Sequence, residues 1–130
     1  SERLDQLLEK GAVPQTLLLV GSREEELEAF AKSLAEKLIL KQAPHARAKL
    51  QAATHPDLHF FRPEGKIGLH SIASIRKLCQ SAAYLPHESS CQCFIIQAAE
   101  RMLPTASNAL LKSIEEPFGR TYFILTTTSV

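Results

Sequence analysis

The residues that decide the fold run from Cys93 to Thr128 and read CFIIQAAERMLPTASNALLKSIEEPFGRTYFILTTT. Two short apolar runs, 94–96 and 122–125, are rich in aromatic and β-branched residues and are typical of buried strands. Between them, Pro104 suits the first turn of a helix and Pro117 ends that helix. A strand, a helix and a second strand without a hairpin turn predict a crossover connection in a parallel sheet. Four residues at helical spacing form the predicted apolar stripe: Leu103, Ala106, Leu110 and Ile114.

The upstream sequence repeats this alternation of strand and helix. The run 16–20 is apolar on both faces, which predicts a strand in the middle of a parallel sheet. After Gly21, a capping box of Ser22 and Glu25 begins a helix. The buried stripe predicted for that helix contains Leu27, Phe30, Ala31, Leu34 and Leu38.

Further strands and helices follow the same logic. Residues 57–61 alternate as a strand, and Ser71 can cap the helix that follows it. An amphipathic helix is also predicted over 1–10, and a polar, Ala-rich helix over 42–54. Four strands alternating with helices predict a single three-layer α/β domain over residues 1–130, with a mostly parallel sheet.

Composition limits the class of protein. The net charge of +1 gives no reason to expect a surface built to coat nucleic acid, and no run approaches the ~20 apolar residues of a membrane helix. Three cysteines, an odd number, favour a reducing compartment, so we predict a cytoplasmic protein. We place Cys91 and Cys93 on opposite faces of a strand, where they cannot chelate together, and we predict no metal.

The loop after the first strand has the framework of a phosphate-binding loop without its chemistry. In the pattern G-x-x-x-x-G-K-[ST], Gly21 supplies the first glycine. Glu26 replaces the second glycine, Leu27 replaces the lysine that neutralises phosphate, and Glu28 replaces the hydroxyl that holds magnesium. The acidic first turn also repels a polyphosphate. We therefore predict no bound nucleotide cofactor.

The strand 94–96 lacks the carboxylates that nucleotidases of this architecture place at its end. Gln97 stands where an aspartate orders magnesium, and Ala98 stands where a second acid positions the attacking water. Glu100 lies further on and is read as a solvated charge. The sequence thus predicts no catalytic residue, because two separate parts of a nucleotide site are absent together.

The segment from Ser107 to Pro117, followed by 122–128, resembles the clamp-loader subunits of bacterial DNA polymerase III. Their pattern is N-A-L-L-K-x-L-E-E-P followed by a strand F-I-L-x-T-T. The segments 13–19, 55–57 and 75–78 are also similar, so the resemblance spans nearly the whole chain. It implies a P-loop-type (AAA+, RecA-like) domain, and the degenerate nucleotide motifs place the chain nearest the delta-prime subunit.

The resemblance implies a function and partners. The function is that of a non-hydrolysing subunit that supports ATP-driven loading of the sliding clamp during DNA replication. The partners are the gamma/tau and delta subunits, with the clamp and primed DNA contacted through the assembled complex. The family's zinc cysteines are missing from 41–54. Because the Ser-Arg-Cys segment, the helical lid and the collar are also missing, we expect an incomplete first domain.

Individual residues take roles only from this resemblance. Asn108, Lys112, Glu115 and Glu116 are candidates for a subunit contact, with a solvated helix face as the alternative. Thr127 or Thr128 lies where the family places its γ-phosphate sensor, and Arg76 lies on a helix that in the family lines the DNA chamber. Two alternative functions remain at this stage: an active gamma-type ATPase with an altered phosphate loop, and a stand-alone α/β domain with another partner.

Overall fold

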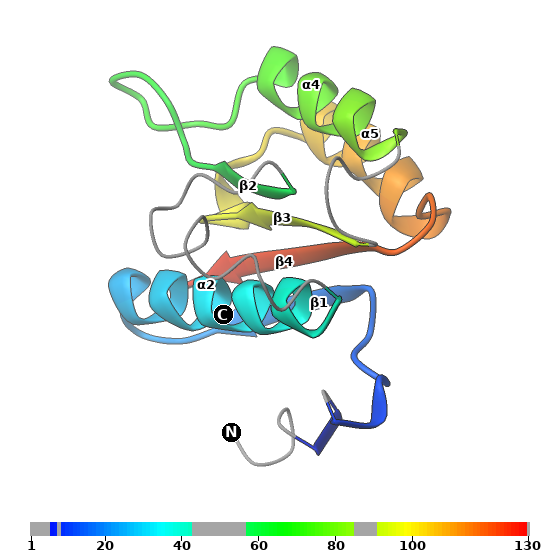
Figure 1. Cartoon of the computed structure of the whole chain (residues 1–130). Coiled ribbons are helices and arrows are strands. Elements are labelled where there is room, and N and C mark those ends of the chain that lie inside the picture. The colour runs from blue at the N-terminus through cyan, green and yellow to red at the C-terminus, as the bar shows by residue number, and fades with distance from the viewer. Residues whose placement is uncertain (1–5, 8, 43–56, 85–90, 130) are drawn as a thin grey trace.

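Strands and helices alternate along the computed structural model, which describes residues 6–7, 9–42, 57–84 and 91–129 (Figure 1). The elements that build the domain are β1 (Thr16–Val20), α2 (Glu24–Gln42), β2 (Leu58–Phe61), α4 (Ile72–Ala82), β3 (Gln92–Ile96), the short 3-10 helix η2 (Ala99–Arg101), α5 (Pro104–Glu115) and β4 (Thr121–Thr127).

All four strands are parallel and lie in the order β1-β4-β3-β2. Leu18 of β1 therefore lies beside Leu125 of β4, although the two residues are far apart in the sequence. Phe94 of β3 pairs in register with Phe123 of β4. The predicted crossover between β3 and β4 and the predicted α/β class are both confirmed.

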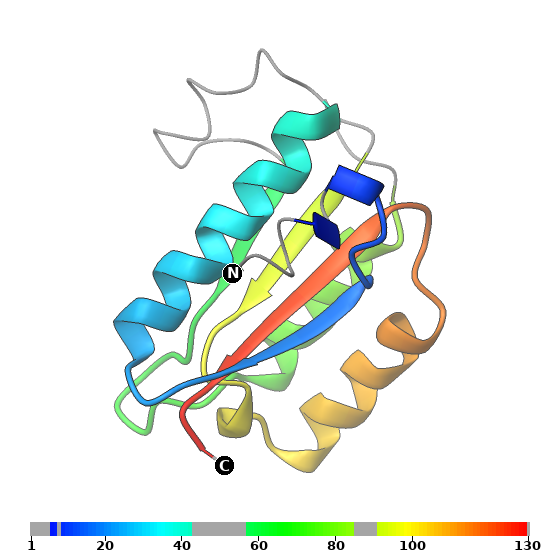
Figure 2. The ribbon, with the colours of Figure 1, turned by 90° about the horizontal axis from the view of Figure 1, so that it is seen from below.

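Helices cover the two faces of the sheet and make three layers. Figure 1 shows α2 on one side of the strands and α4 with α5 on the other, and Figure 2 views the sheet from the α2 side. Cys93 and Ile95 of β3 point into the core against α2, whereas Phe94 and Ile96 point into the core against α4 and α5. A run that faces core on both sides must be continuously apolar, and each such large side chain contributes about 1.5–3 kcal/mol on burial.

The predicted helix stripes are mostly confirmed, but one predicted residue in each helix is exposed. In α2, the residues buried as predicted are Leu27, Ala31, Leu34 and Leu38, but Phe30 is 38% exposed because it lies at the border of the stripe. In α5, Ala106 and Leu110 are buried and Ile114 is partly buried. Leu103 is 56% exposed, because it is the N-cap and precedes the first helical turn.

β1 is the outer strand of the described sheet, not a middle one, so that prediction was wrong. Its inward-facing Leu17 and Leu19 pack beside the core against α2. Leu18 and Val20 are 59% and 52% exposed, and neither joins the core beneath α4 and α5. The face of β1 that carries Leu18 and Val20 therefore stays exposed among the described residues.

Element ends agree with the sequence to within a few residues. Ser71 caps α4 as predicted, because its Oγ accepts from the Ser74 N–H at 3.0 Å. Ser22 does not cap α2: the first helical hydrogen bond joins the Leu27 N–H to the Arg23 carbonyl at 3.1 Å. The predicted helix 1–10 is helical at 6–7 and 9–10, and the predicted helix 42–54 lies outside the described residues beyond 42.

The two cysteines of the third strand share a face, so the prediction of opposite faces was wrong. Residues two apart in an extended chain point the same way, and both thiols pack against α2, with weak contacts to the carbonyls of Leu38 and Ala35. The hydrogen bond with Cys91 and burial raise the pKa of Cys93 well above its ordinary value. Within the described residues, no helix is long and apolar enough to cross a membrane.

Candidate functional site

A cavity of about 450 Å³ lies at the carboxyl ends of β3 and β4, the edge at which open α/β sheets bind ligands. The first turn of α2 and the segment after β2 complete its walls. It joins several residues singled out from the sequence, namely Leu27, Gln97, Ala98, Thr127 and Thr128. Gly21 and Glu26 line a neighbouring cavity of about 420 Å³ beside β1, and Glu28 lines a third beside β2.

The first turn of α2 is acidic. The residues at the positions of a phosphate-binding loop do not face a common site. Leu27 is only 9% exposed, and a Cβ built on Gly21 would lie 3.1 Å from Leu27 Cδ2. The side chain at the lysine position of a phosphate loop therefore packs beneath that loop. Glu26 lies 3.5 Å from Arg23 in an exposed ion pair, which contributes little to stability. This turn offers carboxylates to the solvent where a phosphate loop offers a cation.

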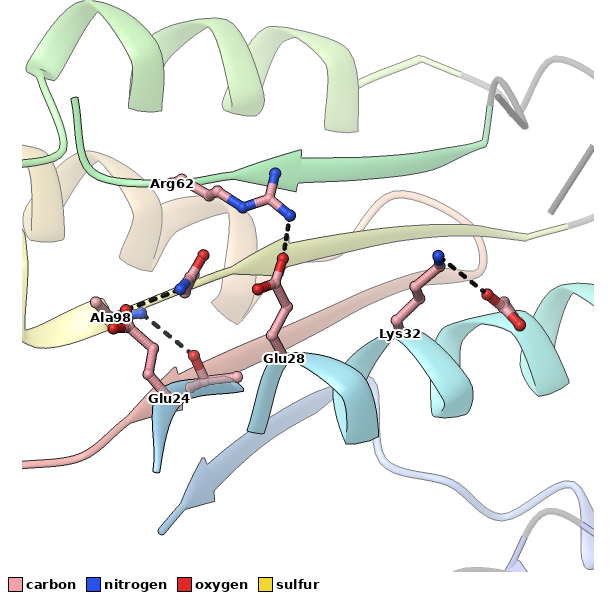
Figure 3. Close-up of polar contacts among 8 residues, drawn as sticks. Glu24, Glu28, Lys32, Arg62 and Ala98 are labelled. Carbon is pink, nitrogen blue, oxygen red and sulfur yellow. Dashed lines mark hydrogen bonds and ion pairs between the residues drawn. The ribbon is translucent and has the colours of Figure 1, made fainter. Parts of the chain in front are cut away.

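The Glu28 carboxylate is paired with an arginine that follows the outer strand β2. Its carboxylate accepts a hydrogen bond from Arg62, which follows β2, and Figure 3 shows the two side chains meeting between β2 and α2. The Arg62 guanidinium also lies 5.1 Å from the centre of the Phe60 ring. The residue at the position of the magnesium-binding hydroxyl thus links α2 to β2.

Gln97 forms a direct bridge between β3 and α2. Its side-chain amide donates to Glu24 Oε1 at 2.8 Å, and its backbone N–H donates to the Phe61 carbonyl at 2.9 Å. The Gln97 carbonyl lies 2.6 Å from Nε2 of His70. A neutral amide bonded to a carboxylate stands where an aspartate and magnesium would meet a nucleotide.

Ala98 has a left-handed backbone, with φ 54° and ψ 60°, which is unfavourable for a residue with a Cβ. The hydroxyl of Thr126 accepts a hydrogen bond from the Ala98 N–H at 3.2 Å and helps to hold this conformation. No pattern in the sequence predicts this feature, because alanine rarely adopts a left-handed conformation. Strained backbone of this kind is concentrated at functional sites.

Thr127 and Glu100 form a contact that the sequence did not predict. The Thr127 hydroxyl lies 2.5 Å from Glu100 Oε1 and also accepts from the Ser129 N–H at 3.0 Å. Glu100 is therefore more than a solvated charge, although it remains exposed. Thr127 is buried and Thr128 is exposed. Thr127, one of the two candidates for the sensor position, already binds a carboxylate of its own chain.

The charges around the cavity are bound within the protein. Arg62 binds Glu28, and Arg101 donates to the carbonyls of Gly68 and Ile67, both at 2.7 Å. In the described part of the chain, no three His, Cys, Asp or Glu side chains are grouped so as to hold a metal ion. Hydrogen bonds and an ion pair around the cavity join α2, β2, β3 and β4, although the buried Gln97 Oε1 has no hydrogen-bond partner among the described residues.

The predicted contact residues lie together on the exposed side of α5. Asn108, Lys112 and Glu115 are exposed, as is Glu116 directly after the helix. Among them is an apolar residue that the prediction missed, Leu111, which is 47% exposed. The helical period would have identified it, because Leu111 is one position past the buried Leu110 and turns away from the core.

Comparisons with known proteins agree with this architecture. The family model described as "DNA polymerase III, delta subunit" matches residues 1–130. The chain is 30% identical over 132 residues to DNA polymerase III subunit delta' of Haemophilus influenzae, covering 95% of this chain and 39% of the relative. It is 34% identical over 79 residues to the Bacillus subtilis subunit of the same name, covering 61% of this chain and 23% of that protein.

A solved structure is similar over nearly the same length. The crystal structure of a DNA polymerase III gamma subunit-related protein from Thermotoga maritima matches with a TM-score of 0.74 and 25% identity, covering 96% of this chain and 39% of that one. The chain belongs to the DNA polymerase III delta-subunit family. The predicted AAA+-type α/β fold is confirmed, and the chain spans about two fifths of the length of the first of these relatives.

Proposed function

We propose that this chain is the first domain of a delta-prime-type clamp-loader subunit that does not hydrolyse ATP. The observation that supports this most strongly is the hydrogen bond from Gln97 to Glu24 at 2.8 Å. This bond joins the end of β3 to the first turn of α2, where a nucleotide and its magnesium ion would otherwise lie. The neutral Gln97 amide is also a weaker magnesium ligand than a carboxylate. The burial of Leu27 supports the same conclusion, because no lysine faces a phosphate there.

The proposed role is structural support of a working motor. Neighbouring gamma-type subunits would hydrolyse ATP, and this domain would form a rigid arm within the complex that loads the sliding clamp onto primed DNA. Its proposed direct partners are the gamma/tau and delta subunits, in the cytoplasm. The exposed side of α5 with Asn108, Lys112, Glu115 and Glu116 is the proposed subunit contact, and the exposed Leu111 favours it over a purely solvated face.

Nucleotide binding tests the proposal against its alternative, an active gamma-type ATPase. Calorimetric titration of the full-length protein with ATP and magnesium should give no binding heat at millimolar nucleotide. A gamma subunit from the same source is the positive control. Magnesium-dependent ATP binding by the full-length protein would contradict the inert-arm function.

Complex formation tests the partners separately. The full-length protein should co-elute with gamma and delta subunits on size-exclusion chromatography. A failure to co-elute, with correctly folded protein, would contradict the clamp-loader role, whatever the nucleotide result.

A further inference from the structure

The peptide unit that joins Gln97 to Ala98 has an unfavourable backbone conformation. Among the described residues, Ala98 is the only residue other than glycine with a positive φ, at 54°. This conformation is unfavourable for alanine, because the Cβ comes close to the following carbonyl oxygen. Such a conformation persists only where the surrounding structure imposes it. The contacts of this peptide unit should therefore account for its orientation.

Two buried side chains hold the peptide unit, one at each end. The Gln97 carbonyl accepts a hydrogen bond from Nε2 of His70 at 2.6 Å, and the Ala98 N–H donates to Oγ1 of Thr126 at 3.2 Å. His70 and Thr126 are 2% and 1% exposed, so both hydrogen bonds are shielded from water. The carbonyl and the N–H of a trans peptide unit point in opposite directions. Turning the unit over would therefore break both hydrogen bonds at once.

The start of α4 is bound to this segment at more than one point. Ser71 is the N-cap of α4, and His70 directly precedes it. The backbone N–H of His70 donates to the Arg101 carbonyl at 3.0 Å, and the Arg101 N–H donates to the Ala98 carbonyl at 2.9 Å. A shift of the start of α4 would therefore pull on the peptide unit through the His70 ring and on η2 through the His70 backbone.

The same peptide unit positions the Gln97 side chain toward α2. The side-chain amide donates to Glu24 in the first turn of α2 at 2.8 Å, and Figure 1 shows α2 on the face of the sheet opposite α4. The Oε1 atom of Gln97 is buried and has no hydrogen-bond partner among the described residues. Because a buried acceptor without a partner is unfavourable, this arrangement carries a cost at Gln97 as well as at Ala98.

We propose that the peptide unit between Gln97 and Ala98 is a two-state switch that couples the start of α4 to the first turn of α2. In the held state, which the structure shows, His70 and Thr126 keep Ala98 left-handed, and Gln97 is bound to Glu24. In the released state the peptide unit turns over, the φ of Ala98 becomes negative, and Gln97 leaves Glu24. Two buried hydrogen bonds offset the costs of the held state, so the loss of either one favours release.

This proposal goes beyond the proposed function and does not depend on it, because it concerns movement within the domain and not the binding of a nucleotide. The movement joins helices on opposite faces of the sheet through one peptide unit of the chain. A displacement of α4 would in this way change the contacts of the first turn of α2.

The test follows the NMR signals of the full-length protein labelled with nitrogen-15. Thr126→Val removes the acceptor and keeps the shape of the side chain, and His70→Phe removes the donor and keeps a ring. In both variants, the Gln97 side-chain amide signals should move toward their positions in Glu24→Ala. The strong cross-peak between the Ala98 N–H and its own Hα, which marks a positive φ, should weaken. Thr126→Ser and His70→Gln keep the acceptor and the donor, so they should leave these signals in place.

Ala98→Gly distinguishes the switch from a general loss of stability. Glycine adopts a positive φ without penalty, so the held state then needs fewer contacts. Adding Ala98→Gly to Thr126→Val should return the Gln97 amide signals toward their wild-type positions. Unchanged Gln97 and Ala98 signals in Thr126→Val would overturn the proposal. Equal shifts in Thr126→Ser would also overturn it, and so would a double variant in which Ala98→Gly restores nothing.

Discussion

At the residue scale, three side chains around the cavity at the ends of β3 and β4 are bound within the protein itself. Leu27 packs under Gly21, Gln97 bonds to Glu24, and Thr127 bonds to Glu100. Each of these contacts uses a position at which a nucleotide site presents a free group. These three residues therefore take part in the protein's own hydrogen bonding and core packing.

Ala98 gives the most direct prediction at this scale. Its φ of 54° penalises any residue with a Cβ, so Ala98→Gly should stabilise the protein by about 0.5–1 kcal/mol. Urea unfolding of the full-length protein and of the variant measures the difference. Ala29→Gly is the matched control, because Ala29 is exposed within α2 and should lose about 1 kcal/mol. A loss of stability in both variants would contradict the strain at Ala98.

The raised pKa of Cys93 should make the unfolding free energy depend on pH. Its folded pKa is raised by the hydrogen bond with Cys91 and by burial, so the folded state keeps the proton that the unfolded state releases above about pH 8.5. The contribution is present in full below that pH and is lost as pH rises, at about 1.4 kcal/mol per pH unit. Unfolding free energies measured from pH 7 to 10 should fall less steeply for Cys93→Ala. An unchanged slope would rule out this source.

At the scale of elements, the link between β3 and α2 can be measured. A double-mutant cycle of Gln97→Ala and Glu24→Ala should give a coupling free energy of about 0.5–1 kcal/mol, because the hydrogen bond is charge-assisted but exposed. The same cycle with Glu25→Ala should give none, since Glu25 is a neighbour in the same turn that pairs with Arg23. Equal coupling free energies in both cycles would mean that the coupling comes from the negative charge of the turn and not from the hydrogen bond between Gln97 and Glu24.

Arg101 of η2 binds the turn after β2 through the carbonyls of Ile67 and Gly68. Substitution of Gly68 tests this contact. Gly68 has φ +69°, and a Cβ there would lie 2.9 Å from Arg101 Nη2. Gly119 has a similar φ of +60°, but a Cβ there would have no atom within 4 Å. Gly68→Ala should therefore lower the unfolding free energy by about 1 kcal/mol more than Gly119→Ala. Adding Arg101→Ala should remove this difference. A difference that persists would show that the guanidinium is not the obstacle.

At the scale of the whole molecule, α5 carries both core and surface. Leu111→Ser should change the unfolding free energy by less than about 0.5 kcal/mol, because the side chain is 47% exposed. If α5 is the subunit contact, the same variant should weaken co-elution with gamma and delta subunits on size-exclusion chromatography. Ala73→Ser, an exposed substitution on α4, is the control. Assembly that is equally strong in both variants would remove α5 from the interface.

Much of the fold could be predicted because local patterns and tertiary structure agree. The run 94–96 could only be a buried strand, and Pro104 and Ser71 mark helix starts that the structure confirms. The prediction failed for Phe30, Leu103 and the place of β1, because these depend on which faces other elements cover. Apolar residue types show that a position can be buried, but they do not show whether another element of the fold covers it.

The sequence by itself determined the alternating strands and helices, the parallel crossover, the family, and the missing lysine and carboxylates. These follow from residue types at fixed spacing along the chain. Only the tertiary structure decided that Gln97 meets Glu24, that Arg62 meets Glu28, and that Thr127 meets Glu100. These contacts join residues 27 to 73 positions apart, and no local period fixes such a distance. It is set by the order of the strands, which brings their carboxyl ends to one edge.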